Sequence, residues 1–452
     1  MSGISSFFGL QTSLRGLLAH QGQLDVTAHN ITNAATEGYS RQSAEVESIV
    51  GLKLASGALA GGGGAYLGGG VSISAYRRAR DVFADLQFRG QSTVNGQATT
   101  TAKTLETVEL ALNEPGDSGI GKLLSRYWDA WKEVSNHPED AATKSALAVN
   151  AQALVDGIKA LDAHIDQIRS HAADELTALT AVGGDILANA QTIAHLNEEI
   201  STAIAGGKQP NDLMDQRDRL IDRLAELGQV TTTDLPNGSL QIAFGGVAVP
   251  LLVDGSTAWA PTPPATQLYA TPSPGGTVGA LQTLSEPGGT LDGYRAELDA
   301  FVNRLVTDVN TAHGAPFFDV AGLTAGTIAI DAAIAADPST VRTTNVAGAP
   351  DGANDVALAV AALQGGAADR AYAGLVLHIG SDARDANRRE AAASAVLESA
   401  IERGSQVSGV SLDEEMANMI RFQRGYQASA RTMSTLDEML DTLINRTGRV
   451  GL

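Results

Sequence analysis

Apolar residues recur at alternating spacings of three and four at both ends of this 452-residue chain. This 3.5-residue repeat is typical of a helix that packs along a seam. Seven residues make about two turns, so residues at these spacings stay on one side of the helix. It predicts a long amphipathic helix at each end, whose apolar side another surface must cover. The N-terminal stripe consists of Phe7, Leu10, Leu14, Leu17, Gln21, Leu24, Ala28 and Ile31.

The C-terminal stripe begins beside a helix-start signal. Ser411 is followed three residues later by Glu414, the spacing of a capping box, and Asp413 and Glu415 add negative charge to the same turn. We expect the two terminal helices to pair as a coiled coil; a second reading is that they also pack against other subunits in a tube or fibre. The stripe consists of Leu412, Met416, Met419, Tyr426, Ala430, Met433, Leu436, Leu440 and Leu443.

Helical periodicity also dominates the middle of the chain. The repeat continues through residues 147–200 and predicts a long helix or a helix pair in a bundle, interrupted at Gly183 and Gly184. Shorter helical patterns cover residues 85–112, 212–227, 291–309 and 384–402.

Two stretches of the middle region are not helical in pattern. In residues 229–287, Leu240, Ile242 and Phe244 alternate with polar residues, and "APTPP" and "TPSPGG" would break a helix, so this part is expected to be a small β-rich insert. Residues 314–354 are rich in Gly, Pro, Thr and Ala and leave room for one or two short strands.

The predicted fold is therefore mainly α with a small β-rich insert, with terminal helices paired as a coiled coil and a long-helix bundle in the middle. The expected divisions are an N-terminal helix, turn and Gly-rich linker over residues 1–75, a first bundle part over 76–228, the β-rich insert over 229–287, a second bundle part over 288–409, and a C-terminal helix over 410–452 that pairs with the first.

Charge and cysteine content exclude several functions. The chain has 31 Lys and Arg against 51 Asp and Glu, a net charge of -20, which would repel nucleic acid and anionic membranes, so neither is an expected partner. The densest basic run, Arg77, Arg78 and Arg80, is expected to be a solvated face. The absence of cysteine removes disulfides and thiol chemistry, and no segment has the apolar length of a membrane span or the pattern of a cleavable signal peptide.

Several short motifs resemble chemical sites without their full pattern. In "GDSGIGKL", residues 116–123, the glycines and Lys122 have the spacing of a phosphate loop, but Leu123 replaces the required hydroxyl residue, and we interpret the motif as a turn that starts a helix. The Gly cluster at residues 57–70 is interpreted as a linker. No histidine pairing indicates a metal, since His195 and Glu198 fit a solvated helix face. No catalytic, cofactor-binding or metal residue is predicted, and an enzyme is not expected.

One stretch of the N-terminal segment carries a specific resemblance. "HNITNAATEGYSRQ", residues 29–42, is similar to the Asn-rich motif of the axial proteins of the bacterial flagellum, matching it at Asn30, Asn33, Thr36, Gly38 and Tyr39. His29 and Ala35 depart from its commonest form, in which both are Asn. Residues 409–445 resemble the C-terminal motif of the same family nearly throughout. Two long motifs at opposite ends make the resemblance specific.

The resemblance implies a structural protein exported unfolded by the flagellar type III apparatus and assembled as a short ring that joins hook to filament, outside the cell. It implies four kinds of partner: further copies of the chain, the hook protein, a second junction protein (hook-associated protein 3), and an export chaperone on the C-terminal helix. Another axial protein, of the hook or distal rod, is an alternative, and a secreted enzyme carried on flagellar-type ends is a more distant one.

The same resemblance assigns the two end segments to contacts between subunits. The residues expected at that interface are Phe7, Leu10, Leu14, Leu17, Leu24, Asn30, Ile31, Asn33, Gly38, Tyr39, Leu412, Met416, Met419, Phe422, Tyr426, Met433, Leu436, Leu440 and Leu443.

Overall fold

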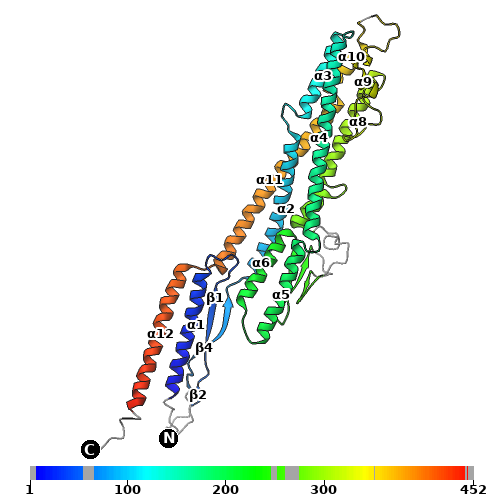
Figure 1. The fold of residues 1–452 in the computed structure, drawn as a ribbon. Coiled ribbons are helices and arrows are strands. Elements are labelled where there is room, and N and C mark those ends of the chain that lie inside the picture. Colours follow the sequence, from blue (N-terminus) through cyan, green and yellow to red (C-terminus); the bar gives the residue numbers. More distant parts are fainter. Residues whose placement is uncertain are drawn as a thin grey trace, which may run out of the picture.

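The computed structural model describes residues 7–53, 66–245, 252–259, 274–350, 352–442 and 445. The molecule is a long rod (Figure 1). Helices α1 (Phe7–Thr32) and α12 (Leu412–Asp441) lie side by side at one end, and a larger helical body extends from there. The predicted mainly α fold with paired terminal helices is confirmed.

A ribbon of two strands completes the end that holds α1 and α12, which we call the arm. Strands β1 (Gln42–Ser48) and β4 (Val71–Arg78) pair antiparallel, with a bulge between Glu45 and Val46, and β2 (Leu52–Lys53) pairs with β3 (Tyr66–Leu67) beyond them. The ribbon packs on α1 where Gly22 leaves space for the side chains of Ile73 and Tyr76.

This ribbon was not predicted. Its strands are rich in Gln, Ser, Glu and Arg, and the apolar alternation that β4 carries, Val71, Ile73 and Ala75, is short. The predicted division between residues 75 and 76 falls inside β4, because the ribbon joins the segment before the Gly-rich stretch to the segment after it.

Two long helices connect the arm to the far end of the body. Helix α2 (Val82–Leu112) and helix α11 (Ala367–Ser408) pack against each other along much of their length (Figure 1). The far end is built from α3 (Ile120–Asn136), α4 (Ala141–Thr180), α8 (Thr290–His313) and α10 (Asp355–Ala361).

The main core lies between these helices and is aromatic at its far end. Trp128, Trp131 and Phe317 are fully buried there, and the core continues along α4 through Ile158 and Ile165. The predicted break in the long repeat is confirmed, since α4 ends at Thr180 and α5 (Asp185–Ala205) begins after Gly183, whose φ is +86°.

A second core lies where the body approaches the arm. Helices α5, α6 (Asn211–Leu227) and α7 (Gly276–Ser285) cover an antiparallel sheet, whose central strand buries Leu240, Ile242 and Phe244 as the alternation predicted. The strand order is β5 (Val230–Asp234), β6 (Leu240–Phe244), β7 (Val253–Asp254) and β8 (Thr257–Ala258).

Helix α7 corrects the predicted extent of the β-rich insert, because it lies within residues 229–287. Its Gly and β-branched residues disfavour a helix, but it packs against α2 and α4, and tertiary contacts outweigh weak local propensities.

Two further segments also differ from the patterns. Residues 314–350 contain a single bridge between Phe318 and Ile330, then α9 (Ala332–Ala336) and the 3₁₀ turn η2 (Pro338–Thr340). Helix α11 begins at Ala367, well before the predicted Arg384. Its first turns bury Ala368, Tyr372, Leu375 and Ile379, spaced four, three and four residues apart, a helical stripe that the predicted bounds left out.

The phosphate-loop lookalike is a turn that starts α3, as interpreted from its sequence. The carboxylate of Glu114 accepts a hydrogen bond of 2.7 Å from the N–H of Gly121 and one of 2.8 Å from the hydroxyl of Tyr372. The chain's own carboxylate therefore occupies the place at the helix N-terminus that a bound anion would take. Within the described ranges, no helix is long and apolar enough to cross a membrane.

Candidate functional site

The seam between α1 and α12 is lined largely by small residues. Gly9 lies against Leu436, so that an added Cβ would stand 3.2 Å from Leu436 Cδ1, and Gly425 lies against the ring of His20, at 2.7 Å from its Cε1. Between these two positions, Gly16 lies against Ser429, with an added Cβ at 3.2 Å from its Oγ. Small side chains let the two helix backbones approach closely at these points. Some of the larger stripe residues therefore lie outside the seam.

The predicted stripe residues accordingly remain only partly covered in a single chain. Leu14, Leu412 and Met416 are exposed, and Leu18, Ile420 and Met439 are exposed apolar residues that the sequence analysis did not single out. The side chain of Phe7 and all of Leu443 lie outside the described part. The half-buried members are Leu10, Leu17, Leu24, Ile31, Met419, Phe422, Tyr426, Met433, Leu436 and Leu440.

Asn30 is the buried centre of the Asn-rich turn, with 1% of its surface exposed. Its Nδ2 donates to the carbonyl of Gln42 at 2.9 Å and to Glu415 Oε2 at 3.1 Å. Its Oδ1 accepts from the N–H of Gln42 at 2.9 Å and from the Tyr39 hydroxyl at 2.7 Å. One carboxamide thus uses its full hydrogen-bonding capacity to join α1, the turn, β1 and α12.

Glu415 makes the matching contact from α12 and is 2% exposed. Its Oε1 accepts a 2.8 Å hydrogen bond from Arg41 Nε, while the main-chain N–H of Arg41 donates to the carbonyl of Ser408 at 2.9 Å. The buried carboxylate is therefore paired with a cation and an amide, as a buried charge requires. Arg41 and Glu415 were not predicted as a pair. The one sequence signal for them is a carboxylate on the apolar side of the first turn of α12.

Gly38 and Tyr39 set the shape of the turn. Gly38 has φ +71°, and a Cβ there would overlap Arg219 of α6, so both backbone and space require glycine. Burial, together with nearby Asp212, Asp215 and Glu415, raises the pKa of Tyr39, which keeps its hydroxyl protonated as the donor to Asn30.

Asn33 closes the end of α1. Its Nδ2 donates to the carbonyl of His29 at 3.0 Å, and its Oδ1 accepts from the hydroxyl of Thr36 at 3.2 Å. Four of the five matched motif residues, Asn30, Asn33, Gly38 and Tyr39, were assigned to subunit contacts, and all four contact other parts of the same chain. Their assignment to subunit contacts stays a prediction.

The arm is fixed to the body by a second set of contacts, which we call the arm root: Arg78, Arg80 and Arg89 with Asp215, Asp218 and Asp222 of α6. Asp218 is shared by all three arginines, with Arg78 at 2.8 Å, Arg80 at 3.1 Å and Arg89 at 3.5 Å. Burial alone would raise the pKa of Asp218, but the three guanidinium groups hold it below its usual value.

The other two carboxylates extend the arm root on either side. Asp215 accepts from Arg78 at 2.8 Å and from the N–H of Ser40 at 3.0 Å, which links the Asn-rich turn to α6. Asp222 pairs with Arg89 at 2.7 Å, and burial raises its pKa despite that contact. The interpretation of Arg77, Arg78 and Arg80 as a solvated face is therefore wrong for Arg78 and Arg80, because α6 presents carboxylates to them; Arg77 is 70% exposed.

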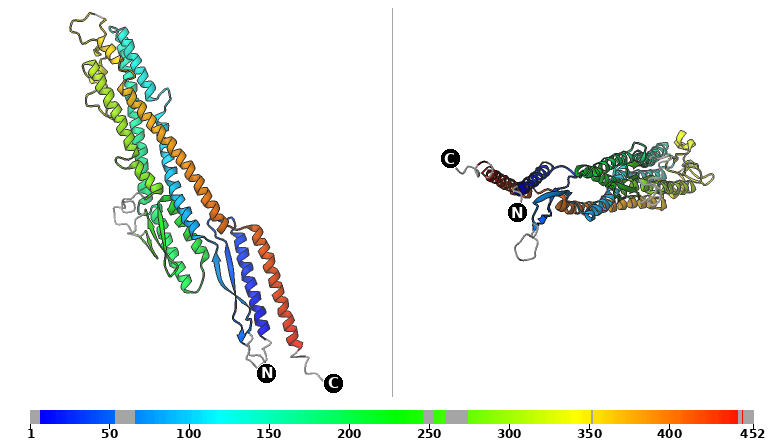
Figure 2. Two further views of the ribbon diagram at one scale, coloured as in Figure 1. Left: turned by 180° about the vertical axis from the view of Figure 1, so that it is seen from behind. Right: turned by 90° about the horizontal axis from the view of Figure 1, so that it is seen from below.

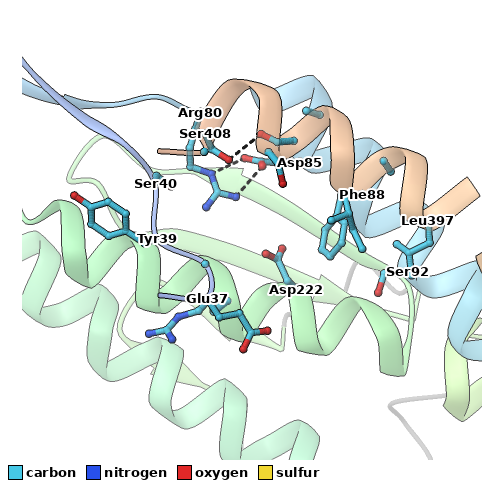
Figure 3. A pocket seen from close by; sticks show the side chains of 18 of the residues that line it. Glu37, Tyr39, Ser40, Arg80, Asp85, Phe88, Ser92, Asp222, Leu397 and Ser408 are labelled. Atoms are coloured by element: carbon cyan, nitrogen blue, oxygen red, sulfur yellow. Dashed lines mark hydrogen bonds and ion pairs between the residues drawn. The ribbon is translucent and has the colours of Figure 1, made fainter. Parts of the chain in front are cut away.

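A pocket of about 590 Å³ lies beside the arm root, between the turn and the body. Figure 3 shows Tyr39 and Ser40 on the side of the turn, Phe88 and Leu397 on the side of α2 and α11, and Asp222 facing the space between them. The arm thus meets the body through a polar network on one side and a partly open space on the other.

Comparison with known proteins identifies the family. The family described as "Flagellar hook-associated protein FlgK helical domain" matches residues 105–327, and "Flagellar basal body rod FlgEFG protein C-terminal" matches residues 405–446. Flagellar hook-associated protein 1 of Bacillus subtilis (strain 168) is 30% identical over 98% of this chain and 99% of its own length. The chain belongs to the flagellar hook-associated protein 1 family.

Other members of this family match over part of their length. Flagellar hook-associated protein 1 of Salmonella typhimurium (strain LT2) is 31% identical, over 58% of this chain and 44% of the relative's length. The same protein of Escherichia coli (strain K12) is 27% identical, over 58% of this chain and 45% of the relative's length. The flagellar hook junction protein FlgK of Burkholderia pseudomallei, a solved structure, is 23% identical over 52% of this chain and 45% of that one, with a TM-score of 0.43. The resemblance to flagellar axial proteins drawn from the end motifs is confirmed.

Among the described residues, no group of three or more His, Asp or Glu side chains is placed to hold a metal ion. His195 lies 3.9 Å from Glu199 on an exposed helix face rather than in a site with Glu198.

Replacing Asp218 by Asn should strongly destabilise the arm root. The change removes the carboxylate shared by Arg78, Arg80 and Arg89 and leaves positive charge partly buried, at a cost of about 3–5 kcal/mol. The unfolding free energy should be measured by denaturant titration, with the exposed Asp437→Asn as the matched control. An unfolding free energy within about 1 kcal/mol of the unaltered chain would show that the network does not stabilise the arm root.

Proposed function

We propose that this chain polymerises as a short ring that joins the flagellar hook to the filament, as a structural component without a catalytic task. The observation that carries the proposal is the arm, in which two long helices pair closely at glycines while Leu14, Leu412 and Met416 of the stripes stay exposed. The family membership of the whole chain supports the same role.

The uncovered apolar surface of the arm supports contacts with further copies. Leu14 and Leu18 on α1 are 42% and 54% exposed, and Leu412 and Met416 on α12 are 51% and 57% exposed. Exposed apolar side chains on both helices of a two-helix unit need a covering surface in water. In a ring every subunit offers one face to the next through heterologous contacts, and the predicted stripe residues would fill them.

The intramolecular contacts of the Asn-rich turn suggest a complementary role. Asn30, Gly38 and Tyr39 hold α1 against α12 and against α6, so they would set the angle at which each subunit presents its stripes. We propose that their effect on assembly acts through this positioning as well as through any direct contact with a neighbour.

The remaining partners are proposed from the family resemblance. The ring would contact the hook protein on one side and hook-associated protein 3 on the other, outside the cell. Before export by the type III apparatus, a chaperone would bind α12 through Met416, Met419, Phe422, Tyr426 and Met433, because flexible Met side chains adapt to different surfaces. A pull-down in which the chain lacking residues 410–452 bound the chaperone normally would contradict this contact.

Deleting the gene tests the function. We expect cells with intact hooks, no filaments and monomeric flagellin in the medium, restored by the unaltered chain. Electron microscopy of the cell surface and blotting of the medium measure both. Loss of the hook or rod itself would point to the alternative axial roles, and normal filaments with a lost hydrolytic activity would point to the enzyme alternative.

A further inference from the structure

One histidine is buried in the part of the body farthest from the arm. The segment that follows α8, drawn in yellow-green and yellow, lies at the end of the rod opposite both termini (Figure 2). All eight histidines of the chain lie in described ranges, and only His313, the last residue of α8, is buried, with 1% of its surface exposed. Its ring packs edge-on against Trp131 and Phe317, at centroid distances of 6.0 and 5.7 Å. A titratable group thus lies inside the aromatic core, where a charge is costly.

The partners of this ring fix the position of its proton. Nδ1 of His313 lies 2.8 Å from the carbonyl oxygen of Ala315, which can only accept, so Nδ1 carries the hydrogen. Nε2 accepts a hydrogen bond of 3.0 Å from the main-chain N–H of Arg342, so it carries none. The imidazole is therefore neutral. A second proton on Nε2 would face the N–H of Arg342 and break that hydrogen bond.

The same two hydrogen bonds close a loop. They join positions 315 and 342, near the two ends of residues 314–342, which we call the tip segment. Arg342 strengthens the closure, because its Nη1 donates to the carbonyl of Gly314 at 3.3 Å. The tip segment in turn covers the far end of the main core with the buried side chains of Ile328, Ile334 and Val341.

The surroundings of His313 lower its pKa. Burial is the largest cause, and the guanidinium of Arg342 acts in the same direction. The carbonyl of Ala315, the carboxylate of Asp331 and the C-terminal end of α8 act in the opposite direction. Both charged side chains belong to the tip segment itself, whereas α3 contributes the ring of Trp131. The closed arrangement therefore favours the neutral ring.

We propose that His313 is an acid-sensitive latch, whose neutral ring holds the tip segment closed on the main core and whose protonation releases it. The proton must enter at Nε2, so its uptake requires the hydrogen bond from Arg342 to open. Because the open state binds this proton more tightly than the closed state, closure is fully stable above about pH 6.5, the ordinary pKa of histidine, and weakens as the pH falls below it. The latch does not depend on the proposed ring, since it acts within one chain.

Hydrogen exchange of the purified full-length chain, followed by mass spectrometry, tests the latch. The reporters are the main-chain N–H groups of Asp319, Asp331 and Arg342, which donate to acceptors that closure brings within reach. After correction for the intrinsic rate, we expect their protection to fall about ten- to thirtyfold from about pH 7 to about pH 5, because opening gains about tenfold per pH unit below the ordinary pKa. Asp337 should not contribute, since hydrogen bonds from Ser339 lower its pKa and keep it ionised over this range.

His313→Gln is the variant that isolates the ring. Its side-chain oxygen can still accept the N–H of Arg342, but it takes up no proton. The protection of the tip segment in this variant should change less than about threefold over the same pH range. His164→Gln, at an exposed histidine of α4, is the matched control and should retain the full response.

The outcomes decide for or against the latch. Equal protection of the tip segment at both pH values in the unaltered chain would overturn it, and so would a full response in His313→Gln, because another group would then be responsible. If the tip segment of His313→Gln is open at both pH values, the ring titration of the unaltered chain decides, measured by NMR with labelled histidine. Protonation of His313 that coincides with the loss of protection supports the latch, whereas protonation with the segment still closed would overturn it.

Discussion

Cells that carry Leu440→Asp should export the protein yet build hooks without filaments. Leu440 is half-buried on α12, on the stripe that we assign to contacts between subunits. A carboxylate there costs several kcal/mol at an apolar interface unless it finds a partner or a proton. The damage should stay local, because neither hydrophobic core includes residues of α1 or α12. Electron microscopy, swimming assays and circular dichroism of the purified variant measure the effect.

The control for this variant is Leu440→Met, which preserves volume and should give normal filaments. Normal swimming by Leu440→Asp cells would contradict the assignment of α12 to assembly. Loss of the main thermal transition in the purified variant would contradict the independence of the arm from the body.

Replacing Leu161 by Asp should have the opposite pattern, a large loss of stability in the body itself. Leu161 is 4% exposed and lies on α4 between Ile158 and Ile165, which are both 0% exposed. A charge inserted there should cost several kcal/mol and lower the melting temperature by about 5 °C. Thermal unfolding followed by circular dichroism measures the shift.

Ala160→Asp is the matched control, because Ala160 is the exposed neighbour of Leu161 on the same helix. It should shift the melting temperature little. If Leu161→Asp melted like the control, the central repeat would not be the core that the structure indicates.

Several features of the fold could be predicted from local sequence. The repeat in residues 147–200 predicted α4 and α5 and the break between them, and the alternation of Leu240, Ile242 and Phe244 predicted the central strand of the sheet. Such signals are local, because each residue's side of a helix or strand follows from its spacing to its neighbours.

The arm root could not be predicted in the same way. Arg78 and Arg80 have the sequence context of solvated arginines, and their burial depends on carboxylates of α6 that are more than a hundred positions away. The β1–β4 ribbon was missed as well, because the alternation of Val71, Ile73 and Ala75 in β4 is short and does not indicate β1 as its partner. The periodicity of a segment does not show which distant segment it pairs with.

The sequence by itself determined the long helices, the apolar stripes at both ends and the Asn-rich motif that indicates the family. The tertiary structure alone decided which side of α1 meets α12, because the seam uses Gly9, Gly16 and Gly425, whose small size matters only when two backbones are close. It also decided that Asn30 and Glu415, 385 positions apart, share one hydrogen bond. A buried polar group must find a partner, and only the folded chain shows which one is within reach.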